Sequence, residues 1–217
     1  GDWSSDVCSS DLTASHILRA GGAVMQLDEI LEQYPKQLKF AGGTAVTVRP
    51  LAKADEKEFH TFFCAIPETE RLLFKHRVTE RKVIHEWCHK IDYGRILPLL
   101  AIADKKILAD ASLHQTLGGW KRHIGRISVV VHPTARGKGI AKVLVQELIE
   151  IAHHLGLERL EAEFMGEQQS ARHVFGALGF SELMTQKDYV KDMQALAHDY
   201  VLMGRRLLTD EEFAGAN

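Results

Sequence analysis

The chain has 217 residues, of which 45% are hydrophobic and 26% are charged. This composition predicts a globular protein of about one domain with short additions, and it excludes a disordered or fibrous chain. Lysine and arginine number 27 against 29 acidic residues, so the net charge of −2 does not favour nucleic-acid binding. The longest apolar runs are far shorter than the roughly 20 residues that a membrane-spanning helix needs.

The cysteines and the first residues carry little information on the fold. Cys8, Cys64 and Cys88 lie too far apart for a disulfide framework or a metal-binding box, so we expect a reducing cytoplasm. Residues 1–12 (GDWSSDVCSSDL) show no apolar periodicity and resemble a translated sequencing adapter. We therefore treat residues 1–12 as non-native in the fold prediction. In that case the native N-terminus, and with it any upstream domain, lies outside the sequence.

The N-terminal half alternates short strands and helices. Apolar residues at helical spacing predict a helix at 27–34, which Pro35 ends. Two alternating segments, 36–40 and 44–49, are joined by Ala41-Gly42-Gly43 and predict a β-hairpin whose second strand ends at Pro50. Further helices are expected at 52–63, 67–74 and 79–90, and further strands at 97–102, 107–114 and 122–131.

The C-terminal half continues the alternation. Ile140, Leu144, Leu148 and Ala152 form one apolar stripe, which predicts an amphipathic helix at 140–155. We expect the later elements to be a strand at 160–164, a helix at 169–178, and strands at 189–191 and 198–203. This order favours an α/β or α+β domain with a mixed sheet of about six to seven strands flanked by helices.

The most informative segment is 127–142, with the sequence ISVVVHPTARGKGIAK. Its β-branched run predicts a buried strand, and a loop with Gly137 and Gly139 leads from there into the amphipathic helix. Glycine lets the backbone approach a ligand closely, and the N-terminus of a helix attracts anions. Arg136 and Lys138 add positive charge. The segment therefore predicts a phosphate-binding strand, loop and helix.

Two common phosphate motifs do not fit this loop. A P-loop requires Ser or Thr after its Gly-Lys pair, and a dinucleotide-binding loop requires a third glycine where Lys142 stands. The pattern Arg136-x-x-Gly139-x-Ala141 instead resembles the acyl-CoA pyrophosphate loop of the GNAT superfamily of N-acetyltransferases. A later segment, Gln168-x-x-Ala171-x-x-x-Phe175-x-x-x-Gly179-Phe180, resembles the family's Asn-x-x-Ala-x-x-x-Tyr-x-x-x-Gly-Phe helix.

The resemblance covers residues 44–207 and implies the GNAT fold for them. It leaves 1–12 as the adapter-derived segment, 13–43 as an N-terminal extension with a short helix and a hairpin arm, and 208–217 as a C-terminal tail. The resemblance also implies that acetyl-CoA is the cosubstrate and lies in a cleft where two central strands splay apart. The acetyl group would pass to a primary amine that attacks directly in a ternary complex.

The resemblance further implies which residues bind acetyl-CoA. The backbone of Val129, Val130 and Val131 would pair with the pantetheine arm, and one N–H would face the thioester carbonyl as a small oxyanion hole. The other expected contacts come from the loop and the later helix: Arg136, Gly137, Lys138, Gly139, Ile140, Ala141, Lys142, Gln168 and Phe175.

The chain departs from the family pattern at two catalytic positions. Phe175 stands where the family's proton-donating Tyr is expected, and Arg126 stands where several relatives have a basic Glu. The acid and the base must therefore come from elsewhere in the chain or from water.

Candidate replacements share faces of neighbouring strands. Glu161 and Glu163 lie two residues apart and could relay a proton, and His114 has an ordinary pKa near the working pH. Asp110 lies on the same strand face as His114. The candidate acids on the closing strands are Tyr189 and Tyr200.

A second motif suggests different chemistry. His85-Glu86-Trp87-Cys88-His89 matches His-Glu-x-x-His, in which two imidazoles on one face of a helix can bind zinc. The longer metzincin pattern fails, because Asp92 and Arg95 stand where Gly and His are required. The next segment is predicted to be a strand rather than a second ligand helix. We therefore expect no metal site, and a surface helix with Trp87 and Cys88 near its packed side.

Three functions stay open at this point. The leading one is an N-acetyltransferase whose acceptor is a small-molecule amine or a protein lysine or N-terminus, with no nucleic-acid or membrane partner. The others are a non-catalytic, regulatory acyl-CoA-binding module and a zinc hydrolase that uses His85, Glu86 and His89. We expect the helices between 52 and 90 and the loop from Leu117 to Trp120 to frame the acceptor site, with Trp120 either stacking on the acceptor or, as we favour, capping the core. A homodimer is one oligomeric state that the sequence leaves open.

Overall fold

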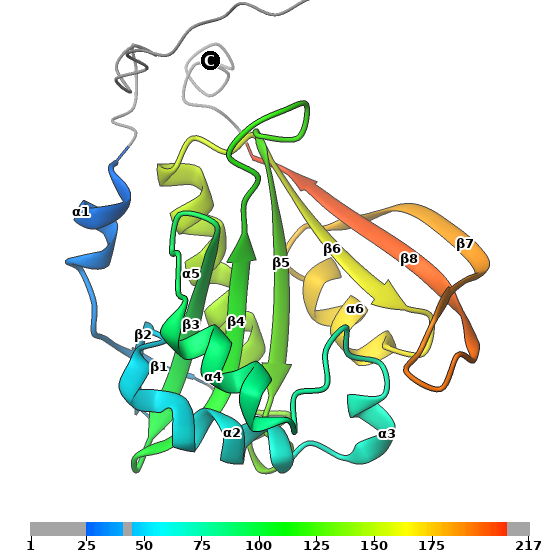
Figure 1. Cartoon of the computed structure of the whole chain (residues 1–217). Coiled ribbons are helices and arrows are strands. Elements are labelled where there is room, and N and C mark those ends of the chain that lie inside the picture. The colour runs from blue at the N-terminus through cyan, green and yellow to red at the C-terminus, as the bar shows by residue number, and fades with distance from the viewer. Residues whose placement is uncertain (1–24, 41–44, 208–217) are drawn as a thin grey trace, which may run out of the picture.

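The protein is built around one large sheet. The computed structural model describes residues 25–40 and 45–207. The strands are Lys36–Lys39 (β1), Ala45–Pro50 (β2), Ile96–Ala103 (β3), Lys106–His114 (β4), Ile124–Val131 (β5), Arg159–Met165 (β6), Ser181–Lys191 (β7) and Ala197–Arg206 (β8). They form an eight-stranded sheet in the order β1-β2-β3-β4-β5-β6-β8-β7 (Figure 1). The mixed α/β fold expected from the sequence is confirmed, with one strand more than the expected maximum.

Helices cover both faces of this sheet. The α-helices are Leu27–Leu31 (α1), Glu56–Cys64 (α2), Glu68–Arg71 (α3), Arg81–His89 (α4), Ile140–His154 (α5) and Gln169–Gly176 (α6), with 3₁₀ turns at Lys53–Asp55 (η1) and Pro133–Ala135 (η2). Figure 1 shows α5 behind the central strands and α2 and α4 in front of them. The sheet is therefore the middle layer of three.

The two faces of the central strands bury two separate clusters. Ile140, Leu144 and Leu148 of α5 pack with alternate residues of β4 and β5 in the larger cluster. Phe59 of α2 and Ile84 of α4 pack in a smaller cluster on the opposite face. Alternation of side chains along a strand makes this division possible. Each fully buried Leu, Ile or Phe side chain contributes roughly 1.5–3 kcal/mol, so both helix layers are firmly attached.

The N-terminal arm extends the same sheet. Its α1 and β1 lie where a short helix and a hairpin arm were expected, and β1 pairs antiparallel with β2. The Tyr34 hydroxyl and the Lys36 ammonium both donate to the Glu147 carboxylate of α5, each at 2.9 Å. The expected turn at 41–43 lies outside the described residues, as do 1–24 and 208–217, and the domain boundaries stay predictions.

The strand β7 is longer than the sequence predicted. It begins at Ser181 rather than at 189 and pairs antiparallel with β8. Most of its residues are exposed because it is the last strand of the sheet, so no apolar alternation marks it in the sequence. Among its exposed side chains are Leu183, Met184 and Tyr189.

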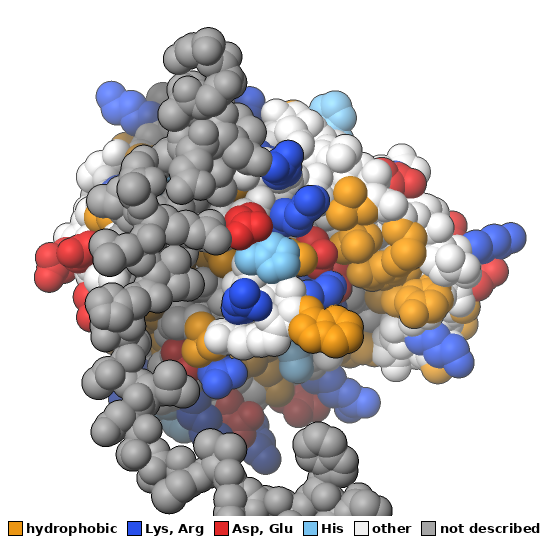
Figure 2. All heavy atoms as spheres, turned by 90° about the horizontal axis from the view of Figure 1, so that it is seen from above, with side chains coloured by type: hydrophobic (Ala, Val, Ile, Leu, Met, Phe, Trp, Pro, Cys, Tyr) orange, Lys and Arg blue, Asp and Glu red, His pale blue; other side chains and the backbone are white. Residues whose placement is uncertain are grey.

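The surface reflects this open edge. Figure 2 shows hydrophobic side chains gathered to the right of the visible face, on the side of the molecule where β7 and β8 lie. An uncovered edge strand with apolar side chains can pair with another chain, so the homodimer stays a prediction. In the described part of the chain, no helix is both long enough and apolar enough to cross a membrane.

Candidate active site

The central feature of the site is a fork between β5 and β6. These two strands are parallel and pair only at Ile124 with Arg159, Gly125 with Leu160, and Arg126 with Glu161. Beyond Arg126 they diverge, while β5 continues to pair with β4 as far as Val131 (Figure 1). The edge of β5 from Ile127 to Val131 therefore has no partner strand on the β6 side. Its backbone groups are available to a ligand that enters the fork.

A loop at the end of β5 leads into the N-terminus of α5. Gly137 and Gly139 have φ values of 73° and 80°, and Gly139 is the N-cap of α5. Glycine adopts this left-handed conformation without steric cost, which turns the backbone sharply into the helix. The first turn of a helix leaves N–H groups without intrahelical partners, and the helix dipole makes that end positive. The loop thus places free N–H groups and the positive end of the helix dipole at the open end of the fork.

The charge of this loop is partly paired. The guanidinium of Arg136 donates two hydrogen bonds of 2.7 Å to the Glu70 carboxylate, and its Nε donates to the carbonyl of Val131. Lys138 and Lys142 are exposed nearby. Burial and the charges of Arg136 and Lys106 lower the pKa of His132, which shows that the surroundings of the loop are electropositive.

Three side chains contact the carboxylate of Glu163 on β6. Its carboxylate accepts hydrogen bonds from the Lys75 ammonium, from Arg126 at 3.4 Å and from the Tyr200 hydroxyl at 3.2 Å. Partial burial opposes ionisation of Glu163, but the hydrogen bond from Lys75 and the charges of Lys75 and Arg126 hold its pKa below the usual range. We call Glu163, Lys75, Arg126 and Tyr200 the Glu163 cluster. It places one carboxylate and two cations at the fork.

Two further titratable groups lie on β4: His114 beside this cluster and Asp110 four residues away along the strand. His114 lies 3.3 Å from the Ser128 hydroxyl, and burial together with the charges of Arg126 and Lys75 lowers its pKa to about 4. Its imidazole is therefore neutral at pH 7. Asp110 pairs with Val130 in the strand register, and burial raises its pKa to about 7. In the described structure its Oδ1 has no hydrogen-bond partner.

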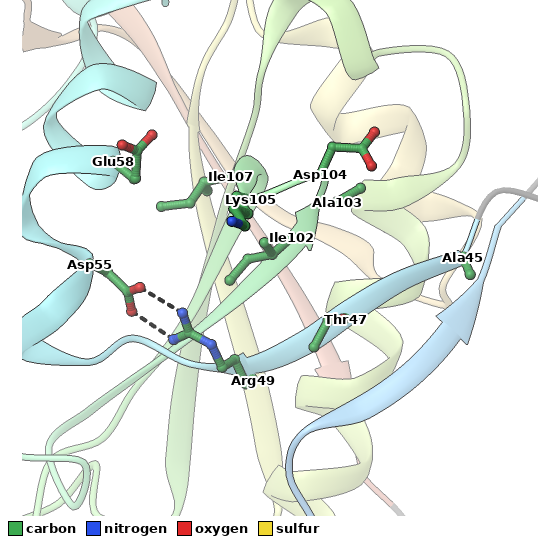
Figure 3. Close-up of a pocket in the computed structure, with 10 residues that line it drawn as sticks. All are labelled: Ala45, Thr47, Arg49, Asp55, Glu58, Ile102, Ala103, Asp104, Lys105 and Ile107. Atoms are coloured by element: carbon green, nitrogen blue, oxygen red, sulfur yellow. Dashed lines mark hydrogen bonds and ion pairs between the residues drawn. The ribbon is translucent and has the colours of Figure 1, made fainter.

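A separate pocket lies away from the fork. It has a volume of about 580 Å³ and lies between β2, the turn from β3 to β4, and α2 (Figure 3). Arg49 and Asp55 point toward one another across it and form two hydrogen bonds of 2.6 Å. Because these two charged groups neutralise each other, and no residue of the fork or the loop lines the pocket, we assign the chemistry to the fork.

The comparisons with known proteins agree with this geometry. The family model described as the Acetyltransferase (GNAT) family matches residues 57–180, which is more than half of the chain. The chain belongs to the GNAT acetyltransferase family. Members of this family use acetyl-CoA as cosubstrate.

Individual relatives match shorter stretches. YwnH of Bacillus subtilis (strain 168), whose name describes a phosphinothricin acetyltransferase, is 30% identical over 81 residues, or 37% of this chain and 49% of YwnH. The L-amino acid N-acyltransferase MnaT of Escherichia coli (strain K12) is 32% identical over 72 residues, or 31% of this chain and 42% of MnaT. The chain thus spans about half or less of the length of these relatives.

The fold is matched over a longer stretch. The structure of an acetyltransferase from Salmonella typhimurium with its cofactor acetyl-CoA superposes with a TM-score of 0.65 at 18% identity. The match covers 76% of this chain and 95% of that one. At this identity the likeness demonstrates the GNAT fold alone.

The structure brings together the three side chains that the sequence selected for catalysis. Glu163 belongs to the Glu163 cluster, and its charge acts on His114. Glu161 forms the last β5–β6 pair and an ion pair of 3.5 Å with Lys121. All three therefore lie around the fork, and their catalytic roles stay predictions.

The expected acetyl-CoA contacts fall into two groups. The backbone of 129–131 and of the loop is accessible at the fork, whereas the side chain of Ile140 is buried, so this residue can offer only its N–H. Gln168 is the N-cap of α6, and its side-chain oxygen accepts a 2.9 Å hydrogen bond from the N–H of Met165. Phe175 has no exposed surface and packs against Phe164 and Phe180. The structure therefore gives Gln168 and Phe175 local structural roles.

The prediction that Trp120 caps the core is wrong. Its side chain is 94% exposed, in the loop that joins the end of β4 to the start of β5. The loop with Gly137 and Gly139 follows the opposite end of β5, so eight residues of strand, roughly 26 Å, separate the two loops. Figure 1 shows the loop after β4 at the upper end of the sheet, whereas the fork opens at the lower end. The Leu117 to Trp120 loop therefore does not frame the open end of the fork.

A short segment from the expected helical region between 52 and 90 lies at the fork instead. Within Glu68–Lys75, which we call the α3 segment, Glu70 contacts Arg136 and Lys75 contacts Glu163. The carbonyl of Leu72 accepts a hydrogen bond from the N–H of Met193, at the tip of the β7–β8 hairpin. The sequence predicted a helix at 67–74, of which Glu68–Arg71 is helical, but it did not predict the contacts of Glu70 and Lys75.

The zinc-like motif has a different context from a metalloprotease. His85 and His89 lie on α4, while Glu86, the residue that would act as base in a zinc hydrolase, forms an ion pair of 3.6 Å with Lys90. Trp87 and Cys88 face the packed side, as predicted, and Cys88 is fully buried. The GNAT family match gives no support to the hydrolase alternative.

Proposed function

We propose that this protein transfers the acetyl group of acetyl-CoA to the primary amine of a small acceptor, by direct attack in a ternary complex. The observation that carries the proposal is the loop with Gly137 and Gly139 at the open end of the fork, where it leads into the N-terminus of α5. Helix N–H groups there would bind the diphosphate of acetyl-CoA. The unpaired edge of β5 would bind the pantetheine arm.

The edge of β5 also suits the chemical step. As the amine nitrogen bonds to the thioester carbon, negative charge develops on the carbonyl oxygen. A backbone N–H of the segment Val129–Val131 would stabilise this charge, because a fixed dipole needs no reorganisation during the reaction. The carbon–sulfur bond then breaks and leaves CoA as a thiolate, which takes up one proton, while the attacking nitrogen loses one.

The Glu163 cluster supports the assignment of these protons. Glu163 is the ionised carboxylate at the fork, so we propose that it accepts the proton of the amine, directly or through water. Tyr200, whose pKa is raised to about 12 by burial and by the charge of Glu163, retains its proton at neutral pH and is the proposed donor to the thiolate. The neutral imidazole of His114 would orient the acceptor through hydrogen bonds.

The same cluster supports a class of acceptor. Arg126 and Lys75 place two cations beside one carboxylate, an arrangement that complements a molecule with an ammonium and an acidic group close together. The name of MnaT describes an acyltransferase that acts on L-amino acids, and phosphinothricin is the acceptor in the name of YwnH. We therefore propose an amino acid or a similar zwitterion as acceptor.

The test is thiol release from acetyl-CoA with a panel of paired acceptors. Each amino acid is compared with the amine that lacks its carboxyl group, and a peptide with a free N-terminus is included. The proposal predicts amine-dependent CoA release with a kcat/KM at least about tenfold higher for the amino acid of each pair, equivalent to about 1.4 kcal/mol. Acetyl-CoA binding with no amine-dependent release would instead support the regulatory-module alternative. Preference for the decarboxylated amines would refute the proposed acceptor class alone.

A further inference from the structure

Three side chains that lie outside the fork form a compact group of potential metal ligands. Glu56 begins α2, and its Oε2 lies 3.1 Å from Nδ1 of His85 and 2.9 Å from Nε2 of His89. The two imidazoles stack with their ring centres 4.1 Å apart. All three ligand atoms lie within 4.8 Å of one another. Two of these residues belong to the His-Glu-x-x-His motif that the proposed transferase does not use.

The chemistry of this group matches a zinc-type ion. Imidazole nitrogen and carboxylate oxygen are the ligands that Zn²⁺ and its neighbours in the transition series prefer, and two imidazoles with one carboxylate are a common three-ligand set. Ligands about 2.0–2.2 Å from a tetrahedral zinc ion lie roughly 3.3–3.6 Å from one another. The distances of 3.1 and 2.9 Å from the Glu56 oxygen to the two nitrogens are a few tenths of an ångström below this range.

The backbone holds these ligands in place from two directions. His85 and His89 are separated by one helical turn, and Glu56 comes from a helix packed against theirs. Phe59 of α2 and Ile84 of α4 are buried in the same cluster, which fixes the distance between the helices. The three side chains remain 37–55% exposed, so an ion can reach them without rearrangement and water can complete its coordination.

In the sequence, the residues that spoke against a metal site, Asp92 and Arg95, both follow the motif. The third ligand instead precedes His85 by 29 residues, in another helix. A pattern search along α4 and the residues after it cannot find a ligand that the fold brings from α2.

We propose that Glu56, His85 and His89 bind one divalent transition-metal ion of the zinc type, which links α2 to α4. The ion would act as a structural link, because Glu86 pairs with Lys90 instead of facing the site. The two linked helices flank the α3 segment in the chain, whose Glu70 and Lys75 reach the phosphate-binding loop and Glu163. Metal binding would therefore hold both ends of the stretch that frames the fork.

The experiment is zinc binding to the full chain after treatment with a chelator. Calorimetry with ZnCl₂ alone should give one ion per chain. Zinc at about 100 times its dissociation constant should raise Tm by roughly 5–10 °C, because only the folded chain brings the three ligands together. Loss of a residue that only hydrogen-bonds to a metal ligand typically weakens a metal site 10–100-fold. Glu56→Gln and His89→Gln each remove a direct ligand, so they should weaken binding at least about tenfold.

Matched controls separate this site from binding to any exposed histidine. His173→Gln changes an exposed helical histidine with no ligating side chain four residues away on either side, and it should leave zinc affinity unchanged. His60→Gln disrupts the nearby pair of His60 and Cys64, whose side chains lie 3.7 Å apart, and it should also have no effect. Because Glu56 and His89 are on the surface, their variants should melt like the wild type in the presence of chelator, which confirms folding.

The outcomes are distinct. Binding that is lost in the Glu56 and His89 variants and kept in both controls supports the site. Absence of zinc binding, binding unchanged in Glu56→Gln, or binding lost in His60→Gln overturns it, and none of these results bears on acetyl transfer.

Discussion

The buried carboxyl of Asp110 gives a prediction with a calculable size. Asp110 is 8% exposed, and in the described part of the chain its Oδ1 has no hydrogen-bond partner. Burial raises its pKa from the ordinary 3.8 to about 7, and the hydrogen bond from Ser112 opposes only part of this effect. The folded protein therefore holds the Asp110 proton more tightly than the unfolded chain does, and ionisation of this group opposes folding.

The sign and size follow from linkage. For a carboxyl whose folded pKa is raised, stability is highest below the unfolded pKa and falls as pH rises through the interval between the two values. Here that interval runs from about pH 4 to about pH 7. One pKa unit corresponds to about 1.36 kcal/mol, so ionised Asp110 costs about 4 kcal/mol above pH 7. At pH 5 the cost is about 2 kcal/mol, which leaves a difference of roughly 2–3 kcal/mol between pH 5 and pH 8.

The substitution Asp110→Asn removes this titration and nearly preserves the shape of the side chain. We expect its stability relative to wild type to improve by roughly 2–3 kcal/mol between pH 5 and pH 8, as measured by urea unfolding at each pH. The control is Asp104→Asn, which makes the same chemical change in the exposed turn between β3 and β4. A stability difference for Asp110→Asn that is the same at both pH values would refute the reasoning.

Three further predictions concern the site and the core. Glu163→Gln should lower kcat about 10²–10⁴-fold while the affinity for acetyl-CoA changes little, because the variant loses the base and keeps the cofactor loop. Steady-state kinetics and calorimetry would measure the two quantities, and an unchanged kcat would exclude Glu163 as the base. Tyr200→Phe should lower kcat at least about tenfold, because it removes the proposed proton donor to the thiolate. Tyr189→Phe is the control, since Tyr189 is 67% exposed, and equal effects of the two substitutions would contradict the role of Tyr200 as donor. Phe175→Ala should lower the free energy of unfolding by about 3–5 kcal/mol, because the Phe175 ring is fully buried. Trp120→Ala should lower it by less than about 0.5 kcal/mol, and a large loss there would contradict the exposed position of Trp120.

The sequence predicted the elements whose periodicity is strong. The helix at 140–155 is α5, whose buried residues include Ile140, Leu144 and Leu148, and the β-branched run before it is β5. The expected loop between them is present, and its Gly137 and Gly139 take positive φ values. These features succeed because they depend on local geometry, in which neighbouring residues determine one another's conformation.

Features that depend on tertiary contacts escaped prediction. The first eight residues of β7 form a strand only through pairing with β8, and Trp120 lies in a loop whose packing no local pattern specifies. Lys75 reaches Glu163 across 88 residues of sequence. Glu56 joins His85 and His89 in the same way, from another helix. A residue that joins a site only through the folding of the chain cannot be predicted from the residue spacing within a local motif.

The central claim is that the backbone of the loop at 136–142 binds the diphosphate of acetyl-CoA. Calorimetric titration of acetyl-CoA into wild type, Gly139→Asp and Gly118→Asp tests it most directly. The aspartate at 139 would place a negative charge at the N-terminus of α5, whereas the aspartate at 118 would enter open space in the loop at the far end of the sheet. The account predicts affinity at least about tenfold weaker for Gly139→Asp and unchanged for Gly118→Asp, a difference of about 1.4 kcal/mol or more. Wild-type affinity in a correctly folded Gly139→Asp variant would contradict it.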